Sequence, residues 1–359
     1  MTVKITKPEI NIREKLTELH KPSGVAGEAM LRAETPQEQF NLIGAGRKNL
    51  FINGAFEVFQ RGAGPASPSS GNSPSTADRW NIPNTSEVSE VVANDRASHL
   101  SKMLKVTANS SGYGQVAQWI ENVRTAAGQN VTVSCWVKSP TAGPMRFHIY
   151  QAFGSGGSST VSVIDDASYF TINKADVWQR FEATIYIPSV DGKTIGDNSY
   201  LAIQMGAPSS IANRIVYYSE MQAELGKVAT PFEHRSYGEE LALCQRYYER
   251  IDGTQAWDQA VGFGDKIYIP IKFHTQKRDG SAVSVEYSTT SPSTWGLFYG
   301  TATTSAAIAN LITGWGTATS DAHHSVQIVN LSADTYTPRG TAALYGIKAG
   351  QWIAFESEI

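Results

Sequence analysis

The residue types that usually carry out catalysis occur here at spacings that do not suit it. His323 and His324 are adjacent, so their side chains diverge, and they lack the i, i+4 spacing of a zinc-binding helix. Asp165 and Asp166 are also adjacent, whereas the two carboxylates of a glycosidase face each other from separate strands. A Gly-x-Ser-x-Gly nucleophile elbow is missing from the sequence. We therefore expect a solvated histidine pair, a polar turn and no enzymatic activity, and we assign no catalytic residue.

Metal and cofactor signals are equally weak. Cys135 and Cys244 lack Cys-x-x-Cys or Cys/His spacing, which favours two buried small hydrophobic residues over the alternative of a disulfide. Glu57 and Glu220 are candidates for a structural calcium site, but oxygen ligands with EF-hand-like spacing are missing. The glycines of residues 44–46 lack the lysine of a phosphate loop. We expect no metal and no cofactor.

The composition argues against two further classes of function. The chain has 359 residues, a formal net charge of −3 and 18% charged residues, with no long basic run. Binding to nucleic acid through phosphate neutralisation is therefore not expected. No apolar run reaches membrane-spanning length, and residues 1–10 are charged, without the apolar core of a signal peptide. We expect neither membrane insertion nor a signal peptide.

Alternation of apolar and polar residues predicts an antiparallel, jelly-roll-like β-sandwich over residues 48–235. Val131, Val133, Cys135 and Val137 alternate with outward-facing neighbours, which is the period of a strand. Helix-period segments are missing between the strands, which excludes a parallel βαβ sheet. Further short strands are expected at residues 50–52, 56–59, 103–107, 146–152, 181–187, 201–205 and 215–218.

A linking helix is predicted at residues 236–252. Ser236 and Glu239 have the spacing of a capping box, in which each side chain bonds a backbone N–H that the first turn leaves free. Its apolar stripe, at spacings of three and four, consists of Leu241, Cys244, Tyr248 and Ile251.

Residues 253–359 are predicted to form a small C-terminal antiparallel β domain, which we call the tip. Strands are expected at residues 267–273, 283–287, 295–299, 326–331 and 352–356, with Gly, Ser and Thr loops between them. Loops on a rigid scaffold often carry recognition. The aromatic residues that we predict to contact a glycan or receptor are Trp257, Trp295, Tyr299, Trp315 and Tyr345, although any one of them is more often a core residue.

Aromatic side chains in the sandwich offer a second set of candidates for stacking on sugars. They are Trp80, Trp119, Trp136 and Trp178. Core or half-buried packing is the favoured interpretation for each, since large aromatic residues dominate protein cores.

Two short amphipathic helices are predicted in an N-terminal arm, residues 1–47. The first has Ile12, Leu16 and Leu19 on its apolar side, and the second has Phe40 and Leu42. Helices this short cannot bury their apolar faces by themselves. We expect the arm to dock on another protein or to form oligomer contacts with sister chains; folding back onto the sandwich is the alternative.

Four motifs in this order resemble bacteriophage tail-fibre and virion structural proteins. They are NLFINGAFEVFQRG with ADRW (residues 49–62 and 77–80), QWIENV (118–123), AGQNVTVSCWVKS (127–139) and ELGKVATPFEHRSYGEELALCQRYYER (224–250). The resemblance covers residues 48–251. It implies a carbohydrate-binding-module-like β-sandwich that is followed by a variable tip, and it supplies no catalytic residue.

The resemblance implies a non-enzymatic virion protein, a tail fibre or tail-associated adhesin whose tip contacts a glycan or receptor on the host cell surface. It implies a homotrimer whose arm docks on other tail proteins, in a virion made in the host bacterial cytoplasm. One alternative is a purely structural capsid-decoration or tail-connector protein. A second alternative, a glycan-degrading enzyme, is disfavoured because the long parallel β-helix repeats of sugar-degrading phage spikes are missing.

Overall fold

The computed structural model shows a mainly β chain. It describes residues 48–62, 64, 76–82, 85–92, 102–110, 112–164, 168–209, 211–252, 257–263, 266–279, 284–287, 297–301, 304–307, 312–315, 319–320, 324–331, 342–347 and 352–358. Several predicted features lie outside these residues: the arm with Ile12, Leu16, Leu19, Phe40 and Leu42, together with Asp165, Asp166, Trp295 and His323. The mainly β class, with antiparallel sheets and one helix in the described part, is confirmed.

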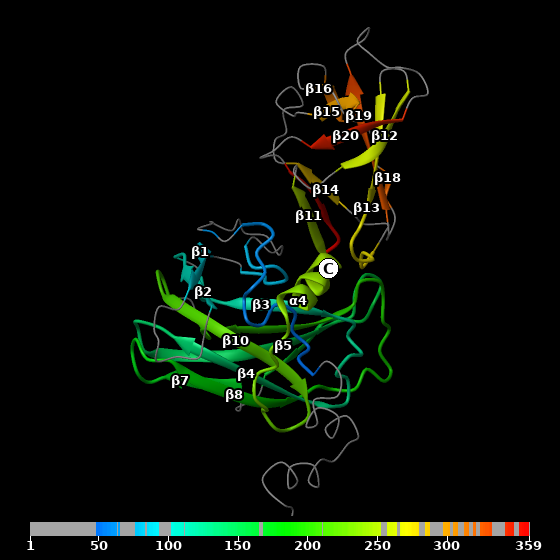
Figure 1. Cartoon of the computed structure of the whole chain (residues 1–359). Helices are drawn as coiled ribbons and strands as arrows, with labels where there is room; N and C mark the ends of the chain where they lie inside the picture. The colour runs from blue at the N-terminus through cyan, green and yellow to red at the C-terminus, as the bar shows by residue number, and fades with distance from the viewer. Residues whose placement is uncertain are drawn as a thin grey trace, which may run out of the picture.

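Two antiparallel sheets form the sandwich (Figure 1). The first sheet has the strand order β1-β2-β10-β4-β8, where the strands are β1 (Thr85–Val92), β2 (Lys102–Ala108), β10 (Ile215–Leu225), β4 (Asn130–Lys138) and β8 (Gln179–Tyr186). The second sheet has the order β3-β9-β5-β6, with β7 also paired to β5; its strands are β3 (Val116–Glu121), β9 (Tyr200–Gly206), β5 (Gly143–Ala152), β6 (Val161–Val163) and β7 (Tyr169–Ile172).

The core between the sheets follows from the alternation in the sequence. Val131, Val133, Cys135 and Val137 of β4 are all buried in one apolar cluster, as predicted, and Phe147 of β5 meets them from the second sheet. Successive side chains of a strand point to opposite faces, so the intervening residues of each strand face outward. This fixes which side chains the sandwich presents on its two outer faces.

The segment before the first strand is irregular, so the prediction of strands at residues 50–52 and 56–59 is wrong. Side chains take the place of a strand ladder here. The Gln118 amide exchanges two hydrogen bonds of 2.7 Å with the backbone of Ile52, and the Asn53 side chain accepts two further backbone N–H groups. Asn53 itself has φ of 59°, a left-handed conformation that asparagine tolerates and a strand does not contain.

The helix α4 (Tyr237–Gln245) begins at the predicted capping box. The Ser236 hydroxyl accepts a hydrogen bond from the backbone N–H of Glu239 at 3.3 Å, and the Glu239 carboxylate accepts one from the backbone N–H of Ser236 at 2.9 Å. Cys244 on this helix and Cys135 in the sandwich are both buried free thiols, so the prediction of two buried small residues is confirmed.

The prediction that this helix extends over residues 236–252 is wrong. α4 ends at Gln245, and β11 (Tyr248–Asp252) pairs with β21 (Trp352–Glu356) near the end of the chain. Tyr248 and Ile251 are buried as strand residues rather than on a helical stripe. Pairing with a strand so distant in sequence supplies backbone hydrogen bonds that a local spacing pattern does not reveal.

The tip is antiparallel β, as predicted. A three-stranded sheet has the order β11-β21-β14, and an eight-stranded sheet has the order β16-β15-β20-β12-β13-β19-β17, with β18 paired to β19. In Figure 1, β11 and β14 lie next to α4, and β15, β16 and β19 lie farther from the sandwich. The strands are β12 (Trp257–Phe263), β13 (Lys266–Lys272), β14 (Ser284–Tyr287), β15 (Leu297–Thr301), β16 (Thr304–Ala307), β17 (Ile312–Trp315), β18 (Thr319–Ser320), β19 (His324–Leu331) and β20 (Ala342–Ile347).

Partly buried ion pairs join the last strand and the residues after it to the sandwich. Arg61 Nη2 lies 3.2 Å from a carboxylate oxygen of Glu356 and 3.6 Å from one of Glu358, and Arg79 pairs with Glu358 as well. The Arg61 guanidinium also lies 3.5 Å from the ring centre of Tyr248. Charges are buried only where partners compensate their lost hydration. The chain thus leaves the sandwich through α4 and β11 and is tied back to it beyond β21.

Candidate functional site

The outer face of the second sheet carries an unusual set of side chains. Val116 and Ile120 of β3 point into the core, so Trp119 and Glu121 point outward from the same strand. The same alternation in β9 and β5 places a further outward set beside them: Tyr200, Ala202 and Gln204 from β9, and Arg146, His148 and Tyr150 from β5. We call Trp119, Tyr200, Ala202, His148 and Tyr150 the aromatic face.

Strand register places two of these aromatic residues on either side of a small one. Ala202 is the direct cross-strand partner of Trp119 on β3 and of Tyr150 on β5. Neighbouring strands are about 4.8 Å apart, so the Trp119 and Tyr150 backbones are separated by roughly 10 Å across the methyl group of Ala202. The Trp119 ring is stacked on the Tyr200 ring, with centroids 4.8 Å apart and planes inclined by 17°. The result is a row in which aromatic side chains lie on either side of Ala202, which is itself only 2% exposed.

A chain of hydrogen bonds lies at the β5 side of the aromatic face. His148 Nδ1 is 2.7 Å from the Tyr150 hydroxyl, and His148 Nε2 is 2.7 Å from the Ser162 hydroxyl. Burial and the nearby Arg146 guanidinium lower the pKa of His148 to about 4. The imidazole is therefore neutral at physiological pH, with one donor and one acceptor nitrogen. One of the two hydroxyl groups donates a hydrogen bond to the imidazole, and the other accepts one from it. The hydroxyl that accepts keeps its own hydrogen, which it can donate to a ligand.

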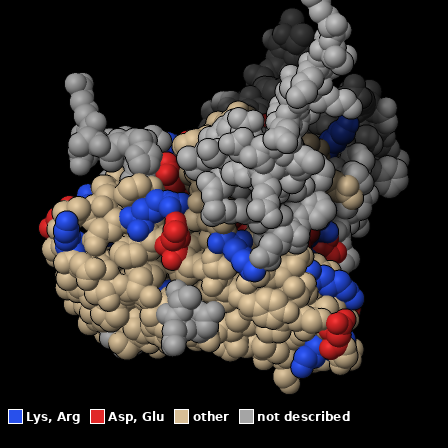
Figure 2. All heavy atoms as spheres, turned by 90° about the horizontal axis from the view of Figure 1, so that it is seen from below, with Lys and Arg blue, Asp and Glu red and all other residues tan. Residues whose placement is uncertain are grey.

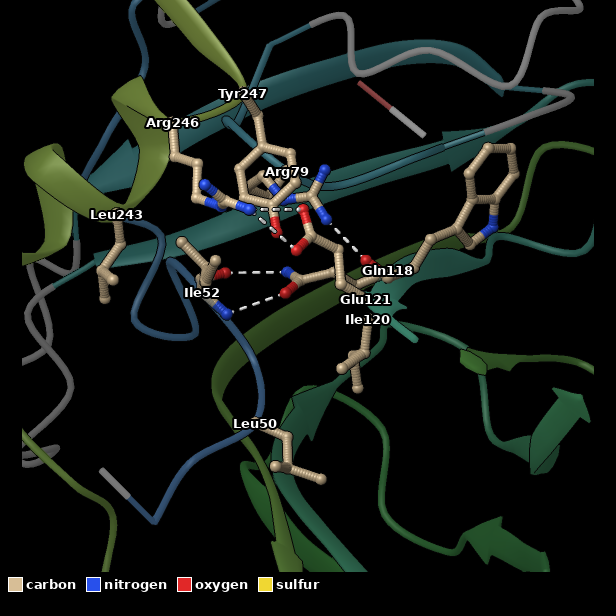
Figure 3. Close-up of a pocket in the computed structure, with 10 residues that line it drawn as sticks. Leu50, Ile52, Arg79, Gln118, Ile120, Glu121, Leu243, Arg246 and Tyr247 are labelled. Atoms are coloured by element: carbon tan, nitrogen blue, oxygen red, sulfur yellow. Dashed lines mark hydrogen bonds and ion pairs between the residues drawn. The ribbon is translucent and has the colours of Figure 1, made fainter. Parts of the chain in front are cut away.

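A cavity lies at the outer edge of β3 (Figure 3), where an isolated bridge joins Ala117 to Asn81. Its volume is about 180 Å³, below the roughly 300–1,000 Å³ of sites that enclose a whole small molecule. We call it the β3-edge cavity. It is lined by Leu50, Ile52, Arg79, Gln118, Trp119, Ile120, Glu121, Leu243, Arg246 and Tyr247.

Polar groups gather at one end of this cavity. Arg246 Nη2 lies 3.1 Å from a Glu121 carboxylate oxygen, and both side chains are about one-third exposed. Arg79 donates to the backbone carbonyl of Trp119, and its guanidinium lies 3.5 Å from the ring centre of Tyr247. Figure 3 shows these groups together, with Leu50 and Ile120 away from them. One end of the cavity is therefore charged and the other is aliphatic.

The structure separates the four sandwich tryptophans, for which core or half-buried packing is favoured over stacking on sugars. Trp80 is fully buried and its ring packs at a tilt against the rings of Phe51 and Phe56, so the core interpretation is confirmed for it. Trp119 is half-buried on the aromatic face, while Trp136 and Trp178 lie half-buried on the side of the first sheet. Residue type alone does not distinguish these three positions.

Tyr150, His148 and Tyr200 belong to the candidate site, although neither composition nor residue spacing identified them. The alternation in β5 does indicate part of the site. Arg146, His148 and Tyr150 lie on one side of the strand, and Phe147 and Ile149 lie on the other. The pairing that brings β9 between β5 and β3 leaves no comparable mark in the sequence.

Four of the five predicted contact residues of the tip lie on described strands. Trp257 is on β12, Trp315 on β17, and Tyr299 of β15 is the direct cross-strand partner of Tyr345 of β20. Trp295 lies outside the described residues. The glycan contacts of this set stay a prediction.

The described residues also give information on membrane-spanning helices, metal-binding groups and patches of one charge. Within the described part of the chain, no helix has the length and apolar character needed to cross a membrane. Among the same residues, no group of three or more His, Cys, Asp or Glu side chains is placed to hold a metal ion. Figure 2 shows Lys and Arg interspersed with Asp and Glu on the described atoms of the face seen from below.

Comparison with known proteins gives structural neighbours but no family. No protein-family model matches the chain, and no curated protein matches it. Among solved structures, a family 22 xylan-binding domain from Paenibacillus barcinonensis is 17% identical, with a TM-score of 0.32 over 41% of this chain and 92% of that one. The C-terminal family 22 carbohydrate-binding module of a Clostridium thermocellum protein is 16% identical, with a TM-score of 0.32 over 42% and 89%. The case for function therefore rests on this chain's own residues.

Proposed function

We propose that the chain is a non-enzymatic carbohydrate-binding protein that holds glycans on the aromatic face. The observation that carries the proposal is the cross-strand row Trp119–Ala202–Tyr150, with the Tyr200 ring stacked beside it. A pyranose ring has one apolar face of C–H bonds, which packs on the electron-rich face of an aromatic ring. Its rim of hydroxyl groups needs hydrogen-bond partners, and the network of Tyr150, His148 and Ser162 supplies them.

We further propose that this binding serves attachment of a bacteriophage tail to its host. The support is the sequence resemblance over residues 48–251 to virion structural proteins. In this proposal the arm docks on tail proteins, three chains assemble, and many weak sugar contacts add up on one particle. The tip, with Trp257, Trp315 and Tyr345, extends the contact with the host surface.

Glycan-array binding by the fluorescently labelled whole chain tests the carbohydrate proposal. We expect binding to a defined subset of glycans that unlabelled chain competes away. Binding to bacterial cells tests attachment: mild periodate, which cleaves vicinal diols of sugars, should abolish it, and protease treatment of the cells should not. Binding that survives periodate and is lost on proteolysis would show a protein receptor instead.

Sedimentation of the whole chain tests the trimer, and particle incorporation tests the arm. A chain lacking residues 1–47 should be absent from purified particles that incorporate the whole chain. If the truncated chain is incorporated at the normal level, the arm does not dock the protein on the particle.

A further inference from the structure

The β3-edge cavity and the aromatic face share two residues. Trp119 and Glu121 point outward from β3 onto the face, and both also line the cavity. Because β3 is the edge strand of its sheet, no further strand of the described part separates the two surfaces. A ligand seated against Trp119 therefore has the cavity within reach of a short substituent.

The walls of the cavity are chemically divided. Leu50, Ile52, Ile120 and Leu243 contribute aliphatic surface, on which a buried hydroxyl would lose its hydrogen bonds with water. At the other end, Glu121 offers carboxylate acceptors and Arg246 offers donors, both of them partly exposed.

A nitrogen of Arg79 that is unpaired among the described residues also indicates that the ligand carries an oxygen atom that accepts a hydrogen bond. Arg79 is only 3% exposed, and its Nε finds no hydrogen-bond partner in the part of the chain that the structure describes. A buried guanidinium donor without an acceptor is costly unless something supplies one. Arg79 lines the cavity, and its other nitrogens already bond Glu358 and the Trp119 carbonyl.

We propose that the β3-edge cavity is a subsite for the acetamido group of an N-acetylated sugar whose ring lies on the aromatic face. The methyl group packs on the aliphatic walls, the carbonyl oxygen accepts from an arginine, and the N–H donates to Glu121. A hydroxyl group on the same sugar carbon atom, in place of the acetamido group, has no methyl group to pack on the aliphatic walls. The volume of about 180 Å³ suits one substituent rather than a whole oligosaccharide. This inference rests on the proposed carbohydrate binding.

Titration calorimetry with two matched probes tests the subsite: a short oligomer of N-acetylglucosamine and the glucose oligomer of the same linkage and length. We expect the whole chain to bind the acetylated probe about tenfold more tightly, a ratio typical of one well-filled apolar contact. Leu243→Phe, which fills the cavity, should reduce the ratio to about one without weakening the glucose oligomer. Leu241→Phe is the matched control, because Leu241 lies on the same helix and does not line the cavity.

Glu121→Gln provides a second variant of nearly unchanged shape, and thermal melting of each variant verifies its folding. This variant should lower the ratio by weakening the acceptor for the amide. Equal binding of both probes by the unaltered chain overturns the subsite alone, as does an unchanged ratio in Leu243→Phe. Absence of binding to any glycan on the array overturns the proposed function and the subsite together.

Discussion

The two outer faces of the sandwich both present aromatic rings but use them differently. On the second sheet, the Trp119 ring stacks on the Tyr200 ring, and Ala202 is the cross-strand partner of Trp119. On the first sheet, Lys138 Nζ lies 5.3 Å from the ring centre of Trp178 and 5.0 Å from that of Tyr217. One face therefore has rings packed on rings, and the other has rings that share a cation.

This difference has a consequence for ligands. An ammonium group over a ring occupies the π surface on which a sugar would stack. The far end of the first sheet's outer face is also covered, because Glu224 and Gln222 of β10 are buried and bonded to Thr230 in the segment that follows. The comparison teaches that ring surface with no cation over it among the described residues, rather than the number of tryptophans, distinguishes the candidate site.

The largest expected effect comes from removing the tryptophan ring of the aromatic face. Trp119→Ala should weaken glycan binding by about 30-fold, or roughly 2 kcal/mol, the usual cost of losing an anchoring aromatic residue. Trp178→Ala on the other face is the matched control and should change binding less than twofold. Calorimetry measures the glycan affinity of both variants. Equal losses of affinity would show that the two faces do not differ in function.

A smaller effect is expected from the hydrogen-bond network. Tyr150→Phe keeps the ring but removes the hydroxyl that bonds His148 at 2.7 Å. We expect about a fivefold loss of affinity, or roughly 1 kcal/mol, the net contribution of one hydrogen bond. Tyr217→Phe on the first sheet gives the matched comparison. A Tyr150→Phe variant with full affinity would show that the face binds through its ring surfaces alone.

The pKa of His148 predicts how binding depends on pH. An ordinary histidine, with a pKa near 6.5, gains its proton between pH 7.5 and 5.5. Burial and Arg146 lower the pKa of His148 to about 4, so its imidazole stays neutral over that range. Affinity should therefore vary less than about twofold between pH 8 and 5.5 and should fall as the pH approaches 4, where both ring nitrogens become donors. A midpoint near pH 6.5 in calorimetric titrations would contradict this.

The sequence predicts the parts of this comparison that depend on local alternation. Val131 to Val137 alternate so regularly that β4 and its buried face follow directly, and the capping box at Ser236 marks where α4 begins. The end of α4 and the strand β11 depend on pairing with β21, which follows near the end of the chain, and local spacing does not encode that pairing. The aromatic face depends on the registers of β9 with β3 and with β5, and those registers combine residues from three separate segments.

The smallest expected effect tests whether Lys138 alone separates the two faces. Lys138→Met removes a cation that lies over two partly exposed rings, which should cost about 0.5–1 kcal/mol of stability in thermal or urea denaturation. Glycan affinity of the otherwise unaltered chain should not change, because the first sheet lacks the row of ring, methyl and ring that Ala202 creates. The double variant with Trp119→Ala sharpens the test. If that variant regains binding, the cation rather than the arrangement of strands is what keeps sugars from the first sheet.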